Sequence, residues 1–327
     1  MQHAIPFLRI RAFSFLPMLV SFVGFSTFRG VMEVGTAVKV ALAANFVTLV
    51  LDPVFIHVLG LGVRGSAFAA VSGDLVNSII YFRLLSSKNL IRWEKISRLP
   101  SWRSIAPLLE GGIALQIRSF VINLTQLMVT RVIQSIDENG IAPAAHALAM
   151  QTFMMGGIFL GALGMATQTM IPNALQRRKD DTSENGGASV PYVQALTRRL
   201  LQWGVGVGVV IGILEFVFLP IILKSSPLQE VREAARVPAL LSISFQWING
   251  LVNVGEGVMM GNGRFVRLAT NMIVAAIGYV GALLFFPNML GLTGVWCSLA
   301  IFVLLRASGV FVFLLSQKSI DAAKKGP

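Results

Sequence analysis

The sequence predicts an all-α protein that forms a polytopic membrane helical bundle. Of its 327 residues, 55% are hydrophobic and 13% are charged, and the mean hydropathy is +0.73. A water-soluble domain of this length needs a larger share of charged residues. The apolar residues also gather in windows of about 20 residues, the length at which a helix crosses the hydrocarbon core of a bilayer. Composition and grouping together predict a chain that crosses a membrane several times.

The apolar windows predict nine transmembrane helices. They lie near 10–28, 36–58, 64–85, 105–131, 144–171, 200–223, 237–260, 266–286 and 292–315. Of the 27 lysines and arginines, 18 fall in loops on one side of the membrane and seven on the other, while Arg118 and Arg306 lie inside spans. The positive-inside rule places the richer side, with the C-terminus, in the cytoplasm or the equivalent compartment of an organelle.

A repeated glycine spacing predicts two lobes. Gly62 and Gly65 recur as Gly291 and Gly294 at an offset of 229, and a basic turn and an apolar helix precede each pair. Six predicted helices separate equivalent points, so the copies have the same orientation. We therefore expect a partial first lobe of three helices over 1–85, a cytoplasmic linker over 86–103, a complete six-helix second lobe over 104–316 and a cytoplasmic tail over 317–327. The chain is expected to begin inside its first lobe.

The stretch from Ala239 to Met260 carries the pattern most informative about function. Five polar residues in this apolar segment follow spacings of four, three, four and three, and so share one helical stripe: Ser242, Gln246, Asn249, Asn253 and Glu256. Polar groups at this depth are costly unless they face protein or a wet cavity. We interpret the stripe as the wall of a transport pathway with Glu256 as its ionisable group. A hydrogen-bonded seam between helices is the alternative.

The predicted helix over 105–131 carries a second polar stripe, which we expect to be buried: Gln116, Ser119, Asn123, Gln126 and Thr130. Arg118 lies beside it. A guanidinium at this depth needs a carboxylate, carbonyl groups or an anionic ligand. Arg118 is therefore expected either to recognise or compensate charge in a solute site, or to form an ion pair with Glu110 or Glu256.

A third polar face is predicted in the first lobe. Asn45, Thr48 and Asp52 share one side of a helix, and Pro53 is expected to kink that helix and to free a carbonyl near the carboxylate. This pattern favours a proton or cation site at Asp52, and an acid near the outer surface satisfied by water is the alternative. Glu215 is a weaker candidate, because it follows a glycine face typical of close helix packing.

Several other function classes find no support in the sequence. The single cysteine, Cys297, excludes an internal disulfide, and the three histidines have no zinc-like spacing, so no metal and no cofactor are expected. The basic residues form no patch with interleaved aromatics, so nucleic acid is not an expected partner. The glycines over 60–65 match a dinucleotide fingerprint but join two apolar helices with no strand. No catalytic constellation spans the helices, so an enzyme is not expected.

With these residues in view, the chain resembles the multidrug and toxic compound extrusion (MATE) family of cation-coupled antiporters. The matching segments are FRGVMEVGT, ANFVTLVLDP followed by GLGVRGSAFA, APAAHALAMQ and QWINGLVNVGEGVMMGNGRF. Arg118 with Ser119 is similar to the Arg-Thr pair of the plastid-type plant branch, which includes exporters of citrate and phenolic acids. The family has twelve helices in two six-helix lobes, which implies that the first three helices are absent here. Its N-lobe Asp corresponds to Asp52, and its C-lobe Asp-Gly corresponds to Glu256 and Gly257.

The residues and the resemblance lead to one functional hypothesis. We expect a secondary transporter in the plastid envelope or plasma membrane that exchanges protons or Na⁺ for a small organic solute, such as citrate, a phenolic acid or a xenobiotic. Glu256 and Asp52 are the expected cation-coupling residues. The expected solute-binding residues are Arg118, Gln246, Asn249, Asn253, Asn123, Gln116, Asn45 and Thr48. The rival hypothesis is a truncated, non-transporting membrane protein that acts as an assembly partner.

Overall fold

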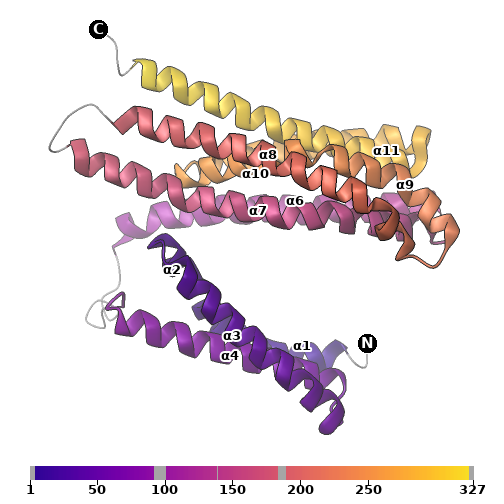
Figure 1. Cartoon of the computed structure of the whole chain (residues 1–327), viewed down its shortest axis with the longest axis horizontal. Helices are drawn as coiled ribbons and strands as arrows, with labels where there is room; N and C mark the ends of the chain where they lie inside the picture. Colours follow the sequence, from indigo (N-terminus) through magenta and orange to yellow (C-terminus); the bar gives the residue numbers. More distant parts are fainter. Residues whose placement is uncertain (1–3, 92–100, 138, 183–188, 324–327) are drawn as a thin grey trace. The chain divides into compact units, whose positions relative to one another are not determined.

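The computed structural model describes residues 4–91, 101–137, 139–182 and 189–323, and each regular element in these ranges is a helix. The expected all-α fold is therefore confirmed. The chain divides into two compact units, Met1–Pro100 and Ser101–Pro327 (Figure 1).

The first unit consists of short and long helices around a small aromatic core. It contains α1 (Ala4–Ala12), α2 (Phe15–Gly30), α3 (Val34–Pro53), the π-helical segment η1 (Val54–Val58) and α4 (Val63–Ser87). The rings of Phe28 and Tyr81 lie 6.0 Å apart between their centroids. The Tyr81 hydroxyl donates a hydrogen bond of 3.2 Å to the carbonyl oxygen of Ala37. This core fastens α2, α3 and α4 together.

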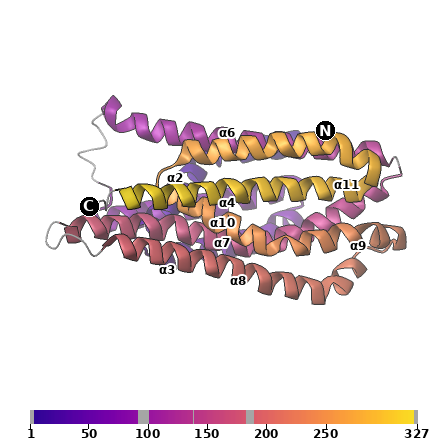
Figure 2. The ribbon, with the colours of Figure 1, turned by 90° about the horizontal axis from the view of Figure 1, so that it is seen from above.

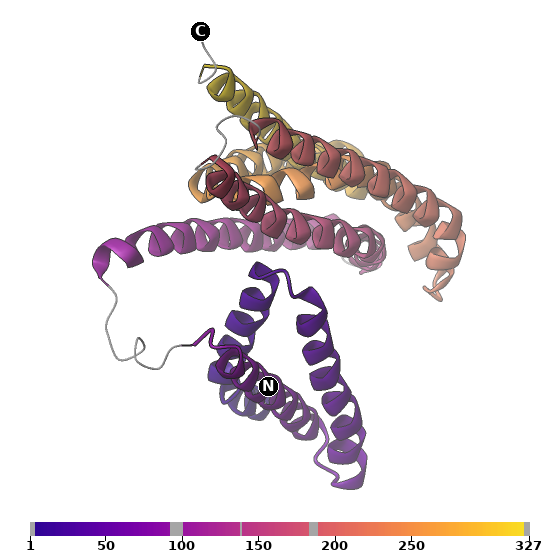
Figure 3. The same cartoon turned by 60° about the vertical axis from the view of Figure 1, so that its left-hand side comes forward.

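The second unit is a bundle in which α10 occupies the interior. It contains α6 (Trp102–Ile136), α7 (Ile141–Thr182), α8 (Ser189–Lys224), α9 (Gln229–Ser244), α10 (Gln246–Gly261) and α11 (Phe265–Ala323). Helices α7 and α8 lie side by side (Figure 1 and Figure 3), and α10 packs against both of them and against α11. α11 is two arms joined at Gly291, and the arms run back along each other (Figure 2).

The predicted single helix over 237–260 is wrong, because the chain bends by 48° between α9 and α10. The bend lies at Phe245, where the helical register is interrupted. The hydroxyls of Ser242 and Ser244 donate to the carbonyls of Ala239 and Leu241, at 2.8 and 2.7 Å. Serine hydroxyls that bond to the helix's own backbone compete with its regular ladder and favour a bend.

The helices have the dimensions of membrane spans, as expected of a multi-pass integral membrane protein. In the described part of the chain, six helices are long and apolar enough to cross a bilayer, and the number rises to eight if each bent pair is one span. The bent pairs are α1 with α2, at 56°, and α9 with α10. The expected count of nine, which treats the two arms of α11 as separate spans, stays a prediction.

The glycine repeat predicted from the sequence has a structural counterpart in the backbone. Gly62 has φ 54° and ψ −132°, and Gly291 has φ 55° and ψ −133°. Such a positive φ is accessible to glycine and costly for most other residues. Three residues further on, a Cβ at Gly65 would collide with the carbonyl of Phe55, and a Cβ at Gly294 with that of Phe286. The two copies therefore place the same tight turn against the same kind of carbonyl group.

The turns that precede these glycines also repeat, but at an offset of 231 rather than 229. The amide of Glu33 donates to the carbonyl of Phe28 at 2.9 Å, and the amide of Arg264 donates to that of Met259 at 2.9 Å. The first copy thus holds two more residues between its turn and its glycine pair. The π-helical segment η1 lies in that interval. A π-helical turn is a known way for a helix to accommodate inserted residues.

The chain continues as a helix past Pro53, and the kink expected there stays a prediction. Val34–Val58 forms one continuous span, in which the helix continues past Pro53 in π register. The amide of Leu59 donates to the carbonyl of Val54 at 3.0 Å, five residues earlier. Pro53 is therefore followed by a change of hydrogen-bond register and not by the end of the helix.

Alanine at Gly294 tests the close approach of the repeated turn. We expect Gly294→Ala to lower the free energy of unfolding by about 1–3 kcal/mol, because the added Cβ would overlap a backbone carbonyl that cannot rotate away. Thermal unfolding in detergent measures the change. Gly281→Ala is the matched control, because a Cβ there meets open space on the same helix. Equal unfolding midpoints for both variants would contradict the packing argument.

Candidate functional site

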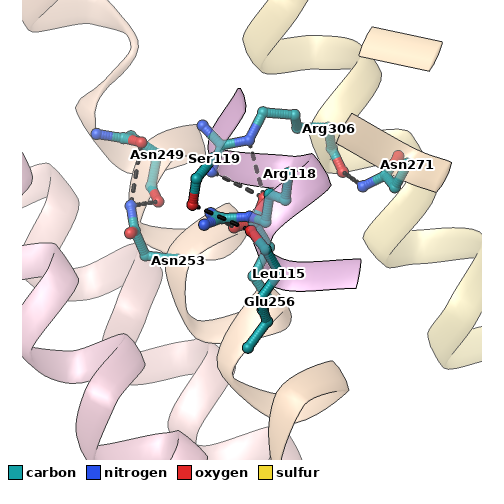
Figure 4. A network of polar contacts seen from close by, with 8 residues as sticks. All are labelled: Leu115, Arg118, Ser119, Asn249, Asn253, Glu256, Asn271 and Arg306. Carbon is teal, nitrogen blue, oxygen red and sulfur yellow. Dashed lines mark hydrogen bonds and ion pairs between the residues drawn. The ribbon is translucent and has the colours of Figure 1, made fainter. Parts of the chain in front are cut away.

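α10 carries Glu256 into the interior of the second unit, where two arginines bind its carboxylate. The Glu256 side chain is 3% exposed. Arg118 of α6 donates from Nη2 to Oε2 at 2.7 Å, and Arg306 of α11 donates from Nε to Oε1 at 2.8 Å (Figure 4). Each carboxylate oxygen is therefore bound by a different arginine from a different helix. We call Arg118, Glu256 and Arg306 the Glu256 cluster.

The Glu256 cluster carries two positive charges and one negative charge. In the described part of the chain, neither arginine forms an ion pair with a second carboxylate. Taking ions out of water costs several kcal/mol each, and only close ion pairing and hydrogen bonding offset that cost. The surplus positive charge is therefore poorly compensated within the cluster, which makes it a favourable place for an anion.

The two arginines differ in how firmly they are held. The backbone carbonyl of Arg306 accepts a hydrogen bond of 3.1 Å from Asn271, and its guanidinium lies 5.5 Å from the ring centre of Phe302. The side chain of Arg306 is 13% exposed, whereas that of Arg118 is 23% exposed. The Nε atom of Arg118 is buried with no hydrogen-bond partner. Arg118 therefore has both the better access and an unused donor.

The sequence interpretation of Arg118 left two carboxylates open as partners, and the structure selects one. Arg118 pairs with Glu256, while Glu110 is exposed on α6. The sequence argument assigned no role to Arg306. An arginine inside an apolar span was the available signal, but its partner lies 50 residues away in the chain.

The remaining stripe residues of α10 form a chain of amide hydrogen bonds. Asn253 donates from Nδ2 to Oδ1 of Asn249 at 3.1 Å, and Asn249 donates to Oε1 of Gln246 at 3.5 Å. Gln246 donates from Nε2 to both carboxylate oxygens of Glu215, at 3.1 and 3.0 Å. Gln246 and Asn249 are buried, and Asn253 is partly exposed. The hydrogen-bonded seam that the sequence left as an alternative describes Gln246 and Asn249, while Glu256 belongs to the charged cluster.

The second polar stripe is not buried within its unit, contrary to expectation. Gln116, Ser119, Asn123, Gln126 and Thr130 are exposed along α6. Asn123 donates to the carbonyl of Ser119 at 2.9 Å, one turn earlier on the same helix. The reason is that α6 packs mainly against α11, which leaves its polar side uncovered in the second unit. Arg118 lies beside this uncovered polar side.

The candidates of the first lobe lie in the first unit. Asn45 is exposed, and the Thr48 hydroxyl donates to the carbonyl of Ala44 at 3.2 Å. Asp52 is partly buried, and its Oδ1 atom is buried with no hydrogen-bond partner. Asp74, another acid of this unit, forms an ion pair of 2.8 Å with Arg11. Asp52 is thus an acid of this unit with an unsatisfied oxygen.

The Glu256 cluster has no charged equivalent in the first copy of the repeat. At the offset of 231 that relates the preceding turns, Glu256 corresponds to Phe25. At the offset of 229 that relates the glycine pairs, Arg306 corresponds to Asn77. The packing supports this register, because a Cβ at Gly24 would meet Tyr81 and a Cβ at Gly255 would meet Val310. The two copies share their glycine turns and helix contacts, and only the second copy carries the charged residues of the Glu256 cluster.

The chain is similar in sequence to plant proteins and matches no protein-family model. It is 26% identical over 315 residues to Protein DETOXIFICATION 45, chloroplastic, and 27% identical over 308 residues to Protein DETOXIFICATION 43, both from Arabidopsis thaliana. These matches cover 95% and 92% of this chain, but 53% and 54% of the relatives. The chain therefore spans about half the length of the curated relatives it matches.

The fold is that of solved MATE transporters. The crystal structure of MATE in the straight conformation matches with a TM-score of 0.85 and 19% identity, over 99% of this chain and 71% of that one. A MOP superfamily transporter from Pyrococcus furiosus matches with a TM-score of 0.83 and 20% identity, over 99% and 71%. The resemblance to the MATE family, including its plastid-type branch, is confirmed.

Neutralising Glu256 tests whether the ion pairs stabilise the second unit. We expect Glu256→Gln to lower the free energy of unfolding by about 3–5 kcal/mol, because it leaves two guanidiniums without a counterion in the interior. Adding Arg306→Met to the same chain is expected to restore part of that loss, since one uncompensated charge is removed. Unfolding of the detergent-solubilised variants measures both changes.

The exposed Arg131 on α6 provides the control for charge removal. Arg131→Met is expected to change the free energy of unfolding by less than about 0.5 kcal/mol, the usual range for surface sites. The stabilising role of the cluster is contradicted if Glu256→Gln behaves like this control, or if Arg306→Met makes the Glu256→Gln chain less stable.

Proposed function

We propose that the protein is a secondary active transporter that moves an organic anion across a membrane in exchange for protons or Na⁺. The observation that carries this proposal is the surplus positive charge of the Glu256 cluster at the centre of a membrane bundle. The DETOXIFICATION relatives and the MATE neighbours support transport as the general activity. Two relatives described as chloroplastic support the plastid envelope as the membrane.

Arg118 is the proposed contact for the solute, and Glu256 is its internal counterion. A solute carboxylate of the same shape replaces the Glu256 carboxylate on the guanidinium of Arg118, and Glu256 stays paired with Arg306. The structure supports this role because Arg118 is the more exposed of the two arginines, with 23% of its side chain exposed against 13% for Arg306. Gln116 and Asn123, on the exposed polar side of the same helix as Arg118, provide hydrogen-bonding groups. The partly exposed Asn253 provides another, one turn before Glu256 on α10.

Charge neutrality favours a solute with one negative charge. The cluster has a net charge of +1, so a phenolic acid monoanion leaves it neutral, whereas a citrate trianion leaves a net charge of −2. Excess charge of either sign is costly inside a membrane. A cationic solute would meet two guanidiniums and is disfavoured. The proposed order of preference is a monoanion before citrate, and citrate before a cationic dye.

The charges of the Glu256 cluster indicate that the exchanged cation binds elsewhere. At Glu256, a proton removes the charge of the carboxylate and releases Arg118, so a proton and a solute anion would promote each other's binding there. A metal ion at Glu256 would be repelled by both arginines. Exchange requires a cation whose binding opposes that of the solute, and this role is proposed for Asp52, whose Oδ1 atom is buried without a partner in the first unit.

Transport by the reconstituted chain tests the proposal. The whole 327-residue chain in liposomes is expected to move a phenolic acid in response to an opposing proton or Na⁺ gradient, with slower movement of citrate and little of a cationic dye. Arg118→Gln is expected to raise the half-saturating concentration at least about tenfold, because a guanidinium–carboxylate contact is lost. Arg131→Gln, an exposed arginine on the same helix, is the matched control and is expected to act like the unchanged chain.

Two outcomes would contradict the proposal. A chain that folds and inserts but moves none of the three solutes under either gradient would favour a non-transporting membrane protein. Transport that prefers the cationic dye, or that is equally affected by Arg118→Gln and Arg131→Gln, would remove the anion site from the Glu256 cluster.

A further inference from the structure

Glu215 on α8 is a second buried carboxylate of the second unit, in surroundings opposite to those of Glu256. It is 7% exposed. In the described ranges no lysine, arginine or histidine forms an ion pair with it. Its side-chain partner is the amide of Gln246, which donates to both carboxylate oxygens. Glu256 is thus paired with two cations, while the partners of Glu215, the side-chain amide of Gln246 and the backbone amide of Gly156, are neutral.

The surroundings of Glu215 are shaped for this contact. A Cβ at Gly156 of α7 would collide with the Gln246 side chain and with Oε1 of Glu215, so the glycine leaves the space in which they meet. The Nε2 atom of Gln246 also donates to the carbonyl of Phe153 at 3.3 Å. The amide group is therefore held between a backbone carbonyl of α7 and the carboxylate of α8.

The helices packed against α8 bring few charged or titratable side chains toward Glu215. On α7, the ring of His146 lies against Trp296, with 5.6 Å between their centroids. On α10, Glu256 lies ten residues beyond Gln246 and is bound by its two arginines. The charged residues of α9 lie in its first half, and they are Glu230, Arg232, Glu233 and Arg236. None of these side chains forms a hydrogen bond or ion pair with Glu215 in the described structure.

The amide chain that ends at Glu215 has a single direction. Asn253 donates to Asn249, Asn249 donates to Gln246, and Gln246 donates to Glu215. This is the orientation that suits an ionised carboxylate, which only accepts hydrogen bonds. A protonated carboxyl group also donates, so it needs an acceptor. The oxygen of the Gln246 amide becomes that acceptor if the amide turns over.

We propose that Glu215 is a proton-binding site and that Gln246, Asn249 and Asn253 transmit its protonation state to the Glu256 cluster. A carboxylate buried without a cation is stabilised by taking up one proton from water, which gives a neutral carboxyl group. Gln246 then turns its oxygen to the new O–H group and its NH₂ group to Asn249. Asn249 and Asn253 turn in sequence, so that the chain runs in the opposite direction.

The reversal changes the group that Asn253 presents one turn before Glu256. In the present orientation the Asn253 NH₂ group is directed to Asn249, where it also donates to the backbone carbonyl at 2.8 Å. After reversal the NH₂ group faces away from Asn249. An additional donor beside Arg118 and Arg306 favours an anion. Protonation of Glu215 therefore strengthens anion binding at the cluster. This proton regulates the anion site and is not the exchanged cation, which is proposed to bind at Asp52, and this last step rests on the proposed function.

Infrared spectroscopy tests the proton site without any solute. Difference spectra of the whole chain in lipid nanodiscs, recorded from about pH 4 to about pH 10, follow the C=O stretch of protonated carboxyl groups across the range in which carboxyls titrate. We expect a band of a buried carboxyl group that disappears at high pH. It should be lost in Glu215→Gln and kept in Glu110→Gln, whose carboxylate is exposed on α6.

A second variant keeps this test decisive if Glu215→Gln fails to fold. Gln246→Met removes both amide donors and retains the acid, so the carboxyl band is expected to change frequency and to persist to higher pH. The proton site is overturned if the unchanged chain shows no buried carboxyl band, or if the band is the same in the unchanged chain and in both variants.

Anion binding tests the transmission of the proton to the cluster. Benzenesulfonate is the probe, because its charge does not change with pH. Its affinity for the unchanged chain is expected to rise at least about fivefold as the pH falls through the midpoint of the carboxyl band, which is the lower end of usual coupling between sites. The rise should disappear in Glu215→Gln and in Gln246→Met.

The outcomes separate this inference from the proposed function. If the carboxyl band titrates as expected but benzenesulfonate does not bind at any pH, the anion site fails and the proton site stands. If benzenesulfonate binds and its affinity depends equally on pH in Gln246→Met, the amide chain does not transmit the proton and that part of the inference is overturned.

Discussion

The structure of the second unit depends on one buried carboxylate bound by two arginines. Glu256 joins α10 to α6 through Arg118 and to α11 through Arg306, so a single residue fixes three helices relative to one another. α10 also packs closely against α8 and α7, because it carries glycines at these contacts: a Cβ at Gly250 would overlap the carbonyl of Gly204 on α8, and a Cβ at Gly257 that of Gly164 on α7. Small residues bring the helices together, and the charges define their register.

An ion triad is a costly way to hold helices, which is an argument for function. Apolar residues of similar size hold helices as well or better, because they need no desolvation. The first copy of the repeat has no charged residues at the corresponding positions, which are Phe25 and Asn77. Both copies keep the glycine turn with φ near 55° and the close contacts of Gly24 and Gly255. The scaffold therefore does not require the charges.

The sequence predicted the features that depend on local pattern and missed those that depend on partners. Apolar windows predicted the helical membrane fold, glycine spacing predicted the repeated turn, and the polar stripe correctly predicted that Glu256 faces the protein interior. The bend at Phe245 was missed, because two serine hydroxyls interrupt a pattern that looks continuous in hydropathy. Arg306 was missed, because its partner is set by the return of the second arm of α11, which sequence spacing does not reveal.

The same limit explains why the polar residues of α10 are buried while those of α6 are exposed. Their spacings are alike in the sequence, yet Gln246 and Asn249 are buried while Gln116 and Asn123 are exposed. Helical spacing tells which residues share a face, but not which neighbour covers that face. α10 has neighbours on several sides, whereas α6 packs mainly against α11. The number of neighbouring helices thus determines whether a polar stripe is buried.

Two buried carboxylates of one bundle, Glu256 and Glu215, have opposite surroundings and are suited to different roles. Glu256 has two cations at 2.7 and 2.8 Å, which hold it charged, while Glu215 has an amide and no cation among the described residues. Groups whose environments favour different protonation states can play different roles at one pH. Glu256 belongs to the polar stripe of α10, and Glu215 of α8 contacts that stripe through its hydrogen bonds with Gln246. One face of one helix therefore links a group suited to bind a proton with a group suited to attract an anion.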